Sequence, residues 1–411
     1  MSPDDSKASY KRALPYFQRA ENAFDDLSAE TDVRADLRTA QEHAKRALAA
    51  KPDFKLAQRG ILLAHLGLGE MYEACLAGLK YMGMLPNDPN FPDIFKDIQL
   101  RLGLSKILRT PSGEGGLPLE RPSTLPPARR RDAWEDAAVA KVTRLIPKPL
   151  AGTTAVFFHV DVGENHPFLD GRQGPKVDYL DTLDMACRAA RATQPGIKII
   201  LLTDEATNLQ GFKGADYVVS VPRDPDHLMY ARLRACQALA MSGRLAGPAL
   251  FLDTDVCLNR DFAPLLGGTF EIGMTYRSAV RFPLMPINEG LFMSTGVRPG
   301  ALAEFLGTCL DIYDWLAQLP HVRERYGFDV RFWRGGQLSL NVFTDWKVPP
   351  LAPDNATFHG VRCRFFHCET HNYSVSADSA LEALDNYWAL HFKGLLPKAL
   401  MNRYFAQIEK H

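Results

Sequence analysis

From Thr153 onward, the sequence alternates between short apolar runs and longer segments with helical spacing. This alternation is the pattern of a parallel sheet whose faces are covered by helices. Open sheets of this kind bind ligands beyond the carboxyl ends of their strands. We therefore expect an α/β fold with a site at that edge. The pattern predicts strands over 155–160, 198–204, 216–221 and 249–256, and helices that include 179–193 and 229–242.

The segment before this region is helical throughout. Apolar residues recur at spacings of three and four, without the alternation of a strand. Ala40 and Pro52 recur 34 residues later as Ala74 and Pro86, which resembles about two tetratricopeptide repeats. Such repeats form concave surfaces that bind peptides. An unrelated helical bundle remains an alternative.

A segment rich in proline and glycine separates the two patterns. Residues 105–131 hold five prolines and three glycines, a composition that does not support a packed core. The sequence therefore predicts an all-helical domain over 1–104, a linker over 105–131 and an α/β domain over 132–411.

Composition excludes several classes of partner. Lysine plus arginine equals aspartate plus glutamate at 48 each, so no net charge attracts the chain to nucleic acid or to an anionic membrane. The start lacks the apolar core of a signal peptide, and no run of about 18 apolar residues occurs. We expect a cytoplasmic protein without a transmembrane segment.

The seven cysteines are scattered and lack paired spacing, which favours buried free thiols. The alternative is a zinc site. Its ligands would be Cys363, His367, Cys368 and His371.

Acidic residues stand at three predicted strand ends, at Asp161, Asp204 and Asp253. The third begins the triplet Asp253-Thr254-Asp255, which closes an apolar run. Successive side chains of an extended segment point to opposite faces, so a bend is needed before both carboxylates serve one site. A second triplet with the same spacing, at 224–226, lies in a polar segment that is typical of a helix cap.

Five segments carry the most specific pattern of the chain. They are Tyr-Ala-Arg-Leu at 230–233, Leu-Asp-Thr-Asp-Val at 252–256, Asn-Glu-Gly at 288–290, Gly-Gln-Leu-Ser-Leu-Asn at 336–341 and His-Phe-Lys-Gly at 391–394. Together they resemble motifs of glycosyltransferase family 8, which includes lipopolysaccharide galactosyltransferases and glycogenin. The likeness covers about residues 153–400. Members of this family have the GT-A fold, hold manganese and a UDP-sugar, and retain the anomeric configuration of the donor. The resemblance therefore implies a mixed, mainly parallel sheet.

The resemblance implies a site. A divalent cation, Mn²⁺ or Mg²⁺, would be held by Asp253, Asp255 and His391, and Gln337 would stabilise charge near the anomeric carbon together with Asp253 at the catalytic centre. Asp161 joins the set from its position at a strand end. The residues expected to contact the sugar nucleotide are Asp161, Arg232, Asp253, Asn288, Gly290, Gly394 and Lys398.

Two positions depart from the family pattern. The aspartate that normally precedes the motif glutamine is Gly336, which leaves the orientation of the sugar or acceptor without its usual carboxylate. The lysine that normally follows the histidine by six residues is Pro397, with Lys398 one place late and Lys393 also near.

The sequence thus favours a retaining glycosyltransferase that moves a hexose from a UDP-sugar to an acceptor glycan or protein recruited by the helical domain. A sugar-nucleotide-binding adaptor with weak catalysis is an alternative, motivated by Gly336 and Lys398. A nucleotidyltransferase is another, although no glycine-rich loop follows the first strand.

Overall fold

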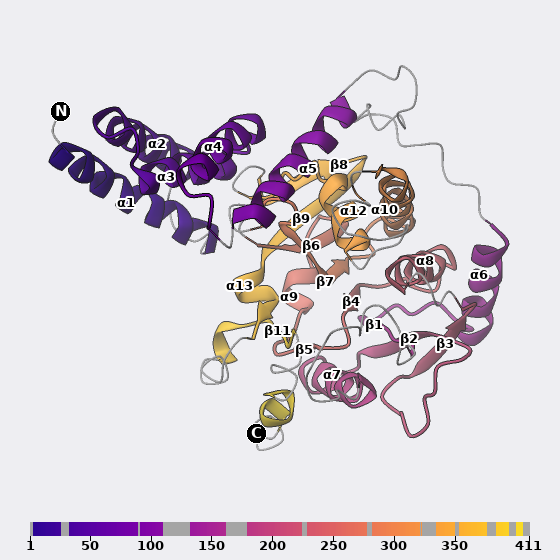
Figure 1. Cartoon of the computed structure of the whole chain (residues 1–411). Helices are drawn as coiled ribbons and strands as arrows, with labels where there is room; N and C mark the ends of the chain where they lie inside the picture. Colours follow the sequence, from indigo (N-terminus) through magenta and orange to yellow (C-terminus); the bar gives the residue numbers. More distant parts are fainter. Residues whose placement is uncertain are drawn as a thin grey trace.

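A computed structural model of the chain contains a group of N-terminal helices beside an α/β domain (Figure 1). The predicted all-helical region and the predicted α/β fold are both confirmed. The structure describes residues 3–25, 33–88, 91–109, 132–161, 179–223, 228–277, 282–320, 322, 334–349, 353–375, 384–393 and 400–405.

The α/β domain is built on an eight-stranded sheet of order β3-β2-β1-β4-β7-β6-β9-β8. Its strands β3, β2, β1 and β4 run parallel, as do β6 and β9, and the other pairs are antiparallel, so the sheet is mixed and mainly parallel as expected. The strands are β1 (Thr154–Phe158), β2 (Lys198–Asp204), β3 (Tyr217–Val221), β4 (Ala249–Leu252), β6 (Ile272–Tyr276), β7 (Ile287–Ser294), β8 (Asn355–Phe358) and β9 (Val361–His367).

Helices cover both faces of this sheet because alternate residues of its strands are apolar on each side. On β1, Val156 packs in the cluster that contains residues of α6, α8, α10 and α12, whereas Phe157 packs with α7 on the opposite face. The helices are α6 (Ala133–Leu145), α7 (Tyr179–Thr193), α8 (Leu228–Met241), α9 (Ala263–Leu266), α10 (Ala301–Gln318), α12 (Gly335–Phe343) and α13 (Cys368–His371).

A second, three-stranded sheet of order β10-β11-β5 lies beyond the end of β4. The chain turns after β4 and enters β5 (Val256–Leu258), so the predicted strand 249–256 is in fact two strands. Strand β11 (Ala389–His391) pairs antiparallel with β5 and parallel with β10 (Tyr373–Ser374). This small sheet brings the C-terminal part of the chain to the end of β4.

Each of the N-terminal helices packs against the next one along the chain. Ala40 and Ala74 are fully buried between helices, and Pro52 and Pro86 each follow a helix end, as expected. The assignment to tetratricopeptide repeats stays a prediction. These helices are α1 (Pro3–Asp25), α2 (Val33–Ala50), α3 (Lys55–Gly67) and α4 (Met71–Met84).

Helix α5 (Phe91–Arg109) runs past the predicted domain boundary at 104 and joins the two parts. Phe91 and Phe95 pack with α4, while Leu104 belongs to the core of the α/β domain. Arg101 donates to the carbonyl oxygen of Pro283 at 2.7 Å. The helical part therefore shares a helix with the sheet domain. The remainder of the predicted linker, 110–131, lies outside the described residues.

The seven cysteines are free, and six of them are buried, which confirms the thiol prediction. Among the residues that the structure describes, no helix has both the length and the apolar character that crossing a bilayer requires.

The chain enters β1 and β4 through two segments that lie against each other. The carbonyl oxygen of Leu150 accepts from the amides of Ala246 and Gly247, at 3.0 and 2.9 Å. A Cβ on Gly247 would lie 2.1 Å from the carbonyl oxygen of Ala151. The close approach of these backbones therefore requires glycine at 247.

We predict that Gly247→Ala lowers the free energy of unfolding by about 1 to 3 kcal/mol, because the backbone must move to admit the methyl group. Gly152→Ala is the matched control, since a Cβ there meets nothing within 4 Å. Its effect should stay within about 0.5 kcal/mol. Chemical denaturation followed by circular dichroism measures both, and equal stability of the two variants would contradict the packing argument.

Candidate active site

A tight turn brings Asp253 and Asp255 to one side of the chain. The amide of Val256 donates to the carbonyl oxygen of Asp253 at 3.1 Å, which closes the turn between β4 and β5. The amide of Asp253 donates to the carbonyl oxygen of Gly290 at 3.0 Å, and the amide of Phe392 donates to the carbonyl oxygen of Asp255 at 2.9 Å. The bend that the sequence required is therefore present, and neighbouring strands hold it on both sides.

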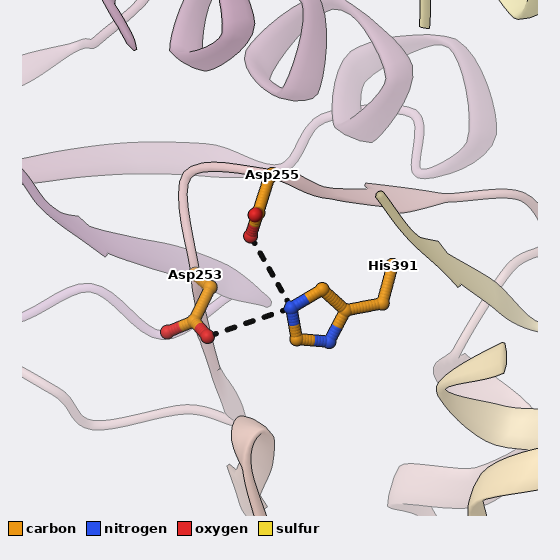
Figure 2. A group of neighbouring side chains, drawn as sticks. All are labelled: Asp253, Asp255 and His391. Atoms are coloured by element: carbon orange, nitrogen blue, oxygen red, sulfur yellow. Dashed lines mark ion pairs between the residues drawn. The ribbon is translucent and has the colours of Figure 1, made fainter. Parts of the chain in front are cut away.

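His391 reaches the turn because β11 pairs with β5, with His391 opposite Val256. Its Nε2 atom lies 3.2 Å from Oδ1 of Asp255 and 3.7 Å from Oδ2 of Asp253 (Figure 2). One donor atom from each of the three residues lies within 4.8 Å of the others, as a shared cation requires. The structure thus brings the three predicted metal ligands together.

The other ring nitrogen of His391 is held by a residue that the motifs do not contain. Nδ1 lies 3.2 Å from Oδ1 of Asn372, a fully buried side chain whose Nδ2 donates to the hydroxyl of Thr275 at 3.2 Å. That second bond fixes the amide so that Oδ1 accepts from Nδ1–H. In the neutral imidazole, Nε2 then carries a lone pair that faces two carboxylates. A cation between them resolves this repulsion, so the donor set fits a metal.

The charge state of His391 agrees with this interpretation. Burial lowers the pKa of His391, and the nearby Lys393 lowers it further, while the Asp255 carboxylate acts in the opposite direction. Burial also lowers the pKa of Lys393, followed by the effect of Arg277. The neutral imidazole that a metal ligand needs is therefore favoured.

Gly290 makes room for the histidine. A Cβ at this position would lie 2.2 Å from Cε1 and 2.7 Å from Nδ1 of His391, and 3.0 Å from Oδ2 of Asp253. The sequence indicated that the backbone must approach something closely here. In the structure, the group that approaches is the imidazole ring of His391.

Strand β7 bulges at this point. Its neighbour β6 pairs Met274 with Phe292 and the next residue, Thr275, with Asn288, so β7 has additional residues between these pairs. Asn288 is buried and supports the bulge, because its Oδ1 accepts from the amide of Gly290 at 3.0 Å. Bulges re-aim side chains beside functional sites. This one turns Glu289 towards Arg232.

Arg232, on α8, is a buried partner of the turn rather than a surface charge. Its Nη1 lies 2.7 Å from Oδ1 of Asp253 and 3.5 Å from Oε1 of Glu289. Burial acts to lower the pKa of Arg232, but the two carboxylates raise it. Burial raises the pKa of Glu289 to about 7, and Arg232 opposes this shift. Asp253 thus directs one oxygen to Arg232 and the other to His391.

Gln337 lies in the first turn of α12, whose N-terminus meets the bulge of β7. Its Nε2 donates to the carbonyl oxygen of Ile287 at 2.8 Å, which fixes the orientation of its side-chain amide. Asn341 holds the same backbone unit, because its Oδ1 accepts from the amide of Ile287 at 2.7 Å. The motif glutamine and asparagine therefore attach α12 to β7.

The remaining strand-end aspartates have other partners. Oδ2 of Asp161, which is half exposed, accepts from the amide of Asn208 at 2.7 Å. Asp204 is buried and its Oδ1 accepts from the amides of Ala206 and Thr207, so it supports the loop after β2. Gly394, Lys398 and the triplet at 224–226 lie outside the described residues.

The alternative zinc ligands do not meet. Cys363 and His367 are four residues apart on β9, which separates them by roughly 13 Å at the rise of a strand. Within the described ranges, the grouping that a shared ion needs is formed by Asp253, Asp255 and His391, and not by these residues.

Sequence reasoning missed two residues of the site, Asn372 and Glu289. Glu289 carried a signal, because a carboxylate inside an apolar strand must have a partner. Asn372 carried none, since nothing in a single sequence indicates which buried amide contacts a histidine.

The sequence matches no protein-family profile and no curated protein. Among solved structures, the chain is similar to the galactosyltransferase LgtC in complex with donor and acceptor sugar analogues, at 13% identity and a TM-score of 0.37, over 62% of this chain and 95% of that one. The glycosyltransferase GlyE of Streptococcus pneumoniae matches at 14% identity and a TM-score of 0.39, over 64% of this chain and 63% of that one. Likenesses this low carry no function to the chain.

We predict that Asn372→Ala weakens binding of Mn²⁺ about 10- to 100-fold, because His391 loses the acceptor that fixes its tautomer and ring orientation. Titration calorimetry with Mn²⁺ measures the effect. Asn386→Ala, at an exposed position of the 3₁₀ turn Leu384–Asn386, should bind like the wild type. Wild-type affinity in a folded Asn372→Ala protein would show that the histidine needs no such support.

Proposed function

We propose that this chain is a metal-dependent glycosyltransferase of the family 8 type, with a GT-A arrangement of its α/β domain. It moves a hexose from a nucleotide diphosphate sugar to an acceptor. The observation that carries the proposal is the meeting of Asp253, Asp255 and His391 beyond the carboxyl end of β4, with Arg232 in contact with Asp253. Residues from four of the five motif segments, far apart in the sequence, contribute to this region.

Asp253, Asp255 and His391 would hold Mn²⁺ or Mg²⁺, since carboxylate oxygens and a neutral imidazole suit such ions. When bound, the cation neutralises the negative charge that develops on the leaving diphosphate.

Arg232 and Gln337 would have different roles beside the metal ligands. Arg232 keeps Asp253 in one orientation through the 2.7 Å contact, so that its second carboxylate oxygen faces His391. Gln337 offers a carbonyl oxygen whose direction is set by the bond from its amide nitrogen to Ile287. A fixed dipole of this kind stabilises the positive charge of an oxocarbenium-like transition state.

Several finer points rest on the sequence alone and remain predictions. These are UDP as the nucleotide, retention of configuration, the cytoplasmic location, and donor contacts from Asp161, Asn288, Gly394 and Lys398.

We predict that Asp255→Asn reduces metal-dependent hydrolysis of the donor by more than about 100-fold. Replacing a residue that only orients a metal ligand typically costs about 10- to 100-fold, and replacing a ligand itself costs more. His391→Ala should weaken Mn²⁺ and donor binding together. A screen of UDP-, GDP- and dTDP-sugars, read by nucleotide release with and without Mn²⁺, tests both variants.

Asp184→Asn is the control, since Asp184 is partly exposed and pairs with Arg188 on α7. Near-wild-type turnover by folded Asp255→Asn would remove the metal assignment. Unchanged Mn²⁺ affinity in His391→Ala would make that histidine structural.

The helical part offers a surface for a protein acceptor. Tyr72, Leu76 and Leu79 are 45 to 55% exposed and lie on one face of α4, at spacings of four and three residues. Side chains at such spacings are neighbours on a helix. We propose that this apolar stripe binds the acceptor. For this role the stripe does not have to contact the donor.

Replacing the three residues of the stripe with serine should reduce transfer to a protein acceptor about tenfold or more, because exposed aromatic and aliphatic residues supply much of the affinity of an interface. Donor hydrolysis should stay unchanged. Transfer from a radiolabelled donor to proteins of a cell extract measures the first activity. Leu145→Ser, at an exposed apolar position on α6, is the control. Full transfer by the triple variant would exclude recruitment through α4.

A further inference from the structure

Position 336 lacks the carboxylate that its motif normally carries, and the structure shows a different carboxylate in that space. A Cβ built on Gly336 would lie 2.4 Å from Oε1, 2.7 Å from Oε2 and 2.8 Å from the carboxyl carbon of Glu289. All three contacts are shorter than real Cβ atoms make. A side chain at 336 would therefore require the carboxylate of Glu289 to leave the position that it occupies in this structure.

We infer that Glu289, from the bulge of β7, supplies the carboxylate that the motif would place at 336 on α12, and that it accepts a hydrogen bond from a hydroxyl of the transferred sugar. The inference rests on the proposed function, and it assigns a specificity-determining residue within it.

The surroundings of Glu289 leave one of its oxygens for a ligand. The side chain is 6% exposed, and the backbone amide of Gln337 donates to its carboxylate. Its Oε1 has no hydrogen-bond partner among the described residues, although Nη1 of Arg232 lies 3.5 Å away. A buried oxygen without a donor is costly, so a donor from a bound molecule would stabilise it.

A sugar hydroxyl matches these groups because it both donates and accepts. The carboxylate of Glu289 offers acceptors, and the guanidinium of Arg232 offers donors. Asp253 is bonded to the same guanidinium, so the hydroxyl would be fixed beside the proposed metal ligands. The adaptor alternative also loses one of its two supports, because the carboxylate missing from 336 is present from β7.

Glu289 has a structural role as well, which a test must separate from recognition. The side chain of Arg334, which precedes α12, makes no capping hydrogen bond, and the carboxylate of Glu289 accepts from an amide in the first turn instead. A variant of Glu289 therefore loses some stability whether or not a sugar is recognised. Discrimination between donors that differ by one hydroxyl is the measurement that a purely structural role would leave unchanged.

The first experiment uses the full-length protein with the most active donor of the UDP-, GDP- and dTDP-hexose panel and its monodeoxy analogues. In the wild type, kcat/KM should fall at least about tenfold for the analogue that lacks the recognised hydroxyl. In Glu289→Ala, kcat/KM for the parent donor should fall by a similar factor, and the preference over that one analogue should disappear. Affinity for the free nucleotide with Mn²⁺ should stay within about twofold, because that binding does not involve the sugar.

The second experiment moves the carboxylate. Gly336→Asp alone should lose activity and thermal stability, because the new side chain meets Glu289. The double variant Glu289→Ala/Gly336→Asp should be at least about tenfold more active than Glu289→Ala and should regain the discrimination. Glu289→Ala/Gly336→Ala is the control, since it relieves the same contact without restoring a carboxylate.

The outcomes are distinct. If the wild type turns over a donor and folded Glu289→Ala keeps the full preference over every deoxy analogue, the inference is wrong and the proposed function stands. The same conclusion follows if the double variant with aspartate is no better than the one with alanine. If the wild type neither binds nor hydrolyses any donor of the panel, the proposed function fails and this inference fails with it.

Discussion

The pairing of β11 with β5 is the interaction on which the site depends. The two strands are short, yet their register sets His391 opposite Val256 and so beside Asp255. Gly290 allows this approach from the side of β7, where any larger residue would meet the ring. The turn after β4, the bulge of β7 and the end of β11 therefore have to form together. A fault in any one of them separates the carboxylates from the imidazole.

Burying these polar groups is costly, and the structure offsets the cost by sharing partners. Arg232 contacts both Asp253 and Glu289, and Asn372 connects His391 to Thr275. An isolated buried charge costs several kcal/mol, and removing one partner of such a pair typically costs about 3 to 5 kcal/mol. Shared partners hold the side chains of this network in place. For the same reason, replacing one of them leaves its partners buried and unpaired.

The sequence predicted the parts of the fold that follow from local pattern. Strands β1 to β4 are short apolar runs, helices α7 and α8 are longer segments between them, and Asp253, Asp255 and His391 occur in recognisable motifs. It did not predict the relation between Glu289 and Gly336, because that depends on which backbone approaches which side chain in space. Nor did it reveal that α5 packs on the sheet domain, because the proline- and glycine-rich composition of 105–131 placed the domain boundary at 104, inside this helix.

Helix α5 has a consequence for how the whole chain melts. Its first half is buried with α4 and its second half with the sheet domain, so neither core can lose it without exposing apolar surface of the other. Domains joined only by a linker unfold in separate transitions. Here the two parts share α5, so the free energy that stabilises the sheet domain also resists opening of the helical array. If recombination at residue 104 replaced this helical array with a homologous one, the new array would also have to supply the residues of α5 that pack on the sheet domain.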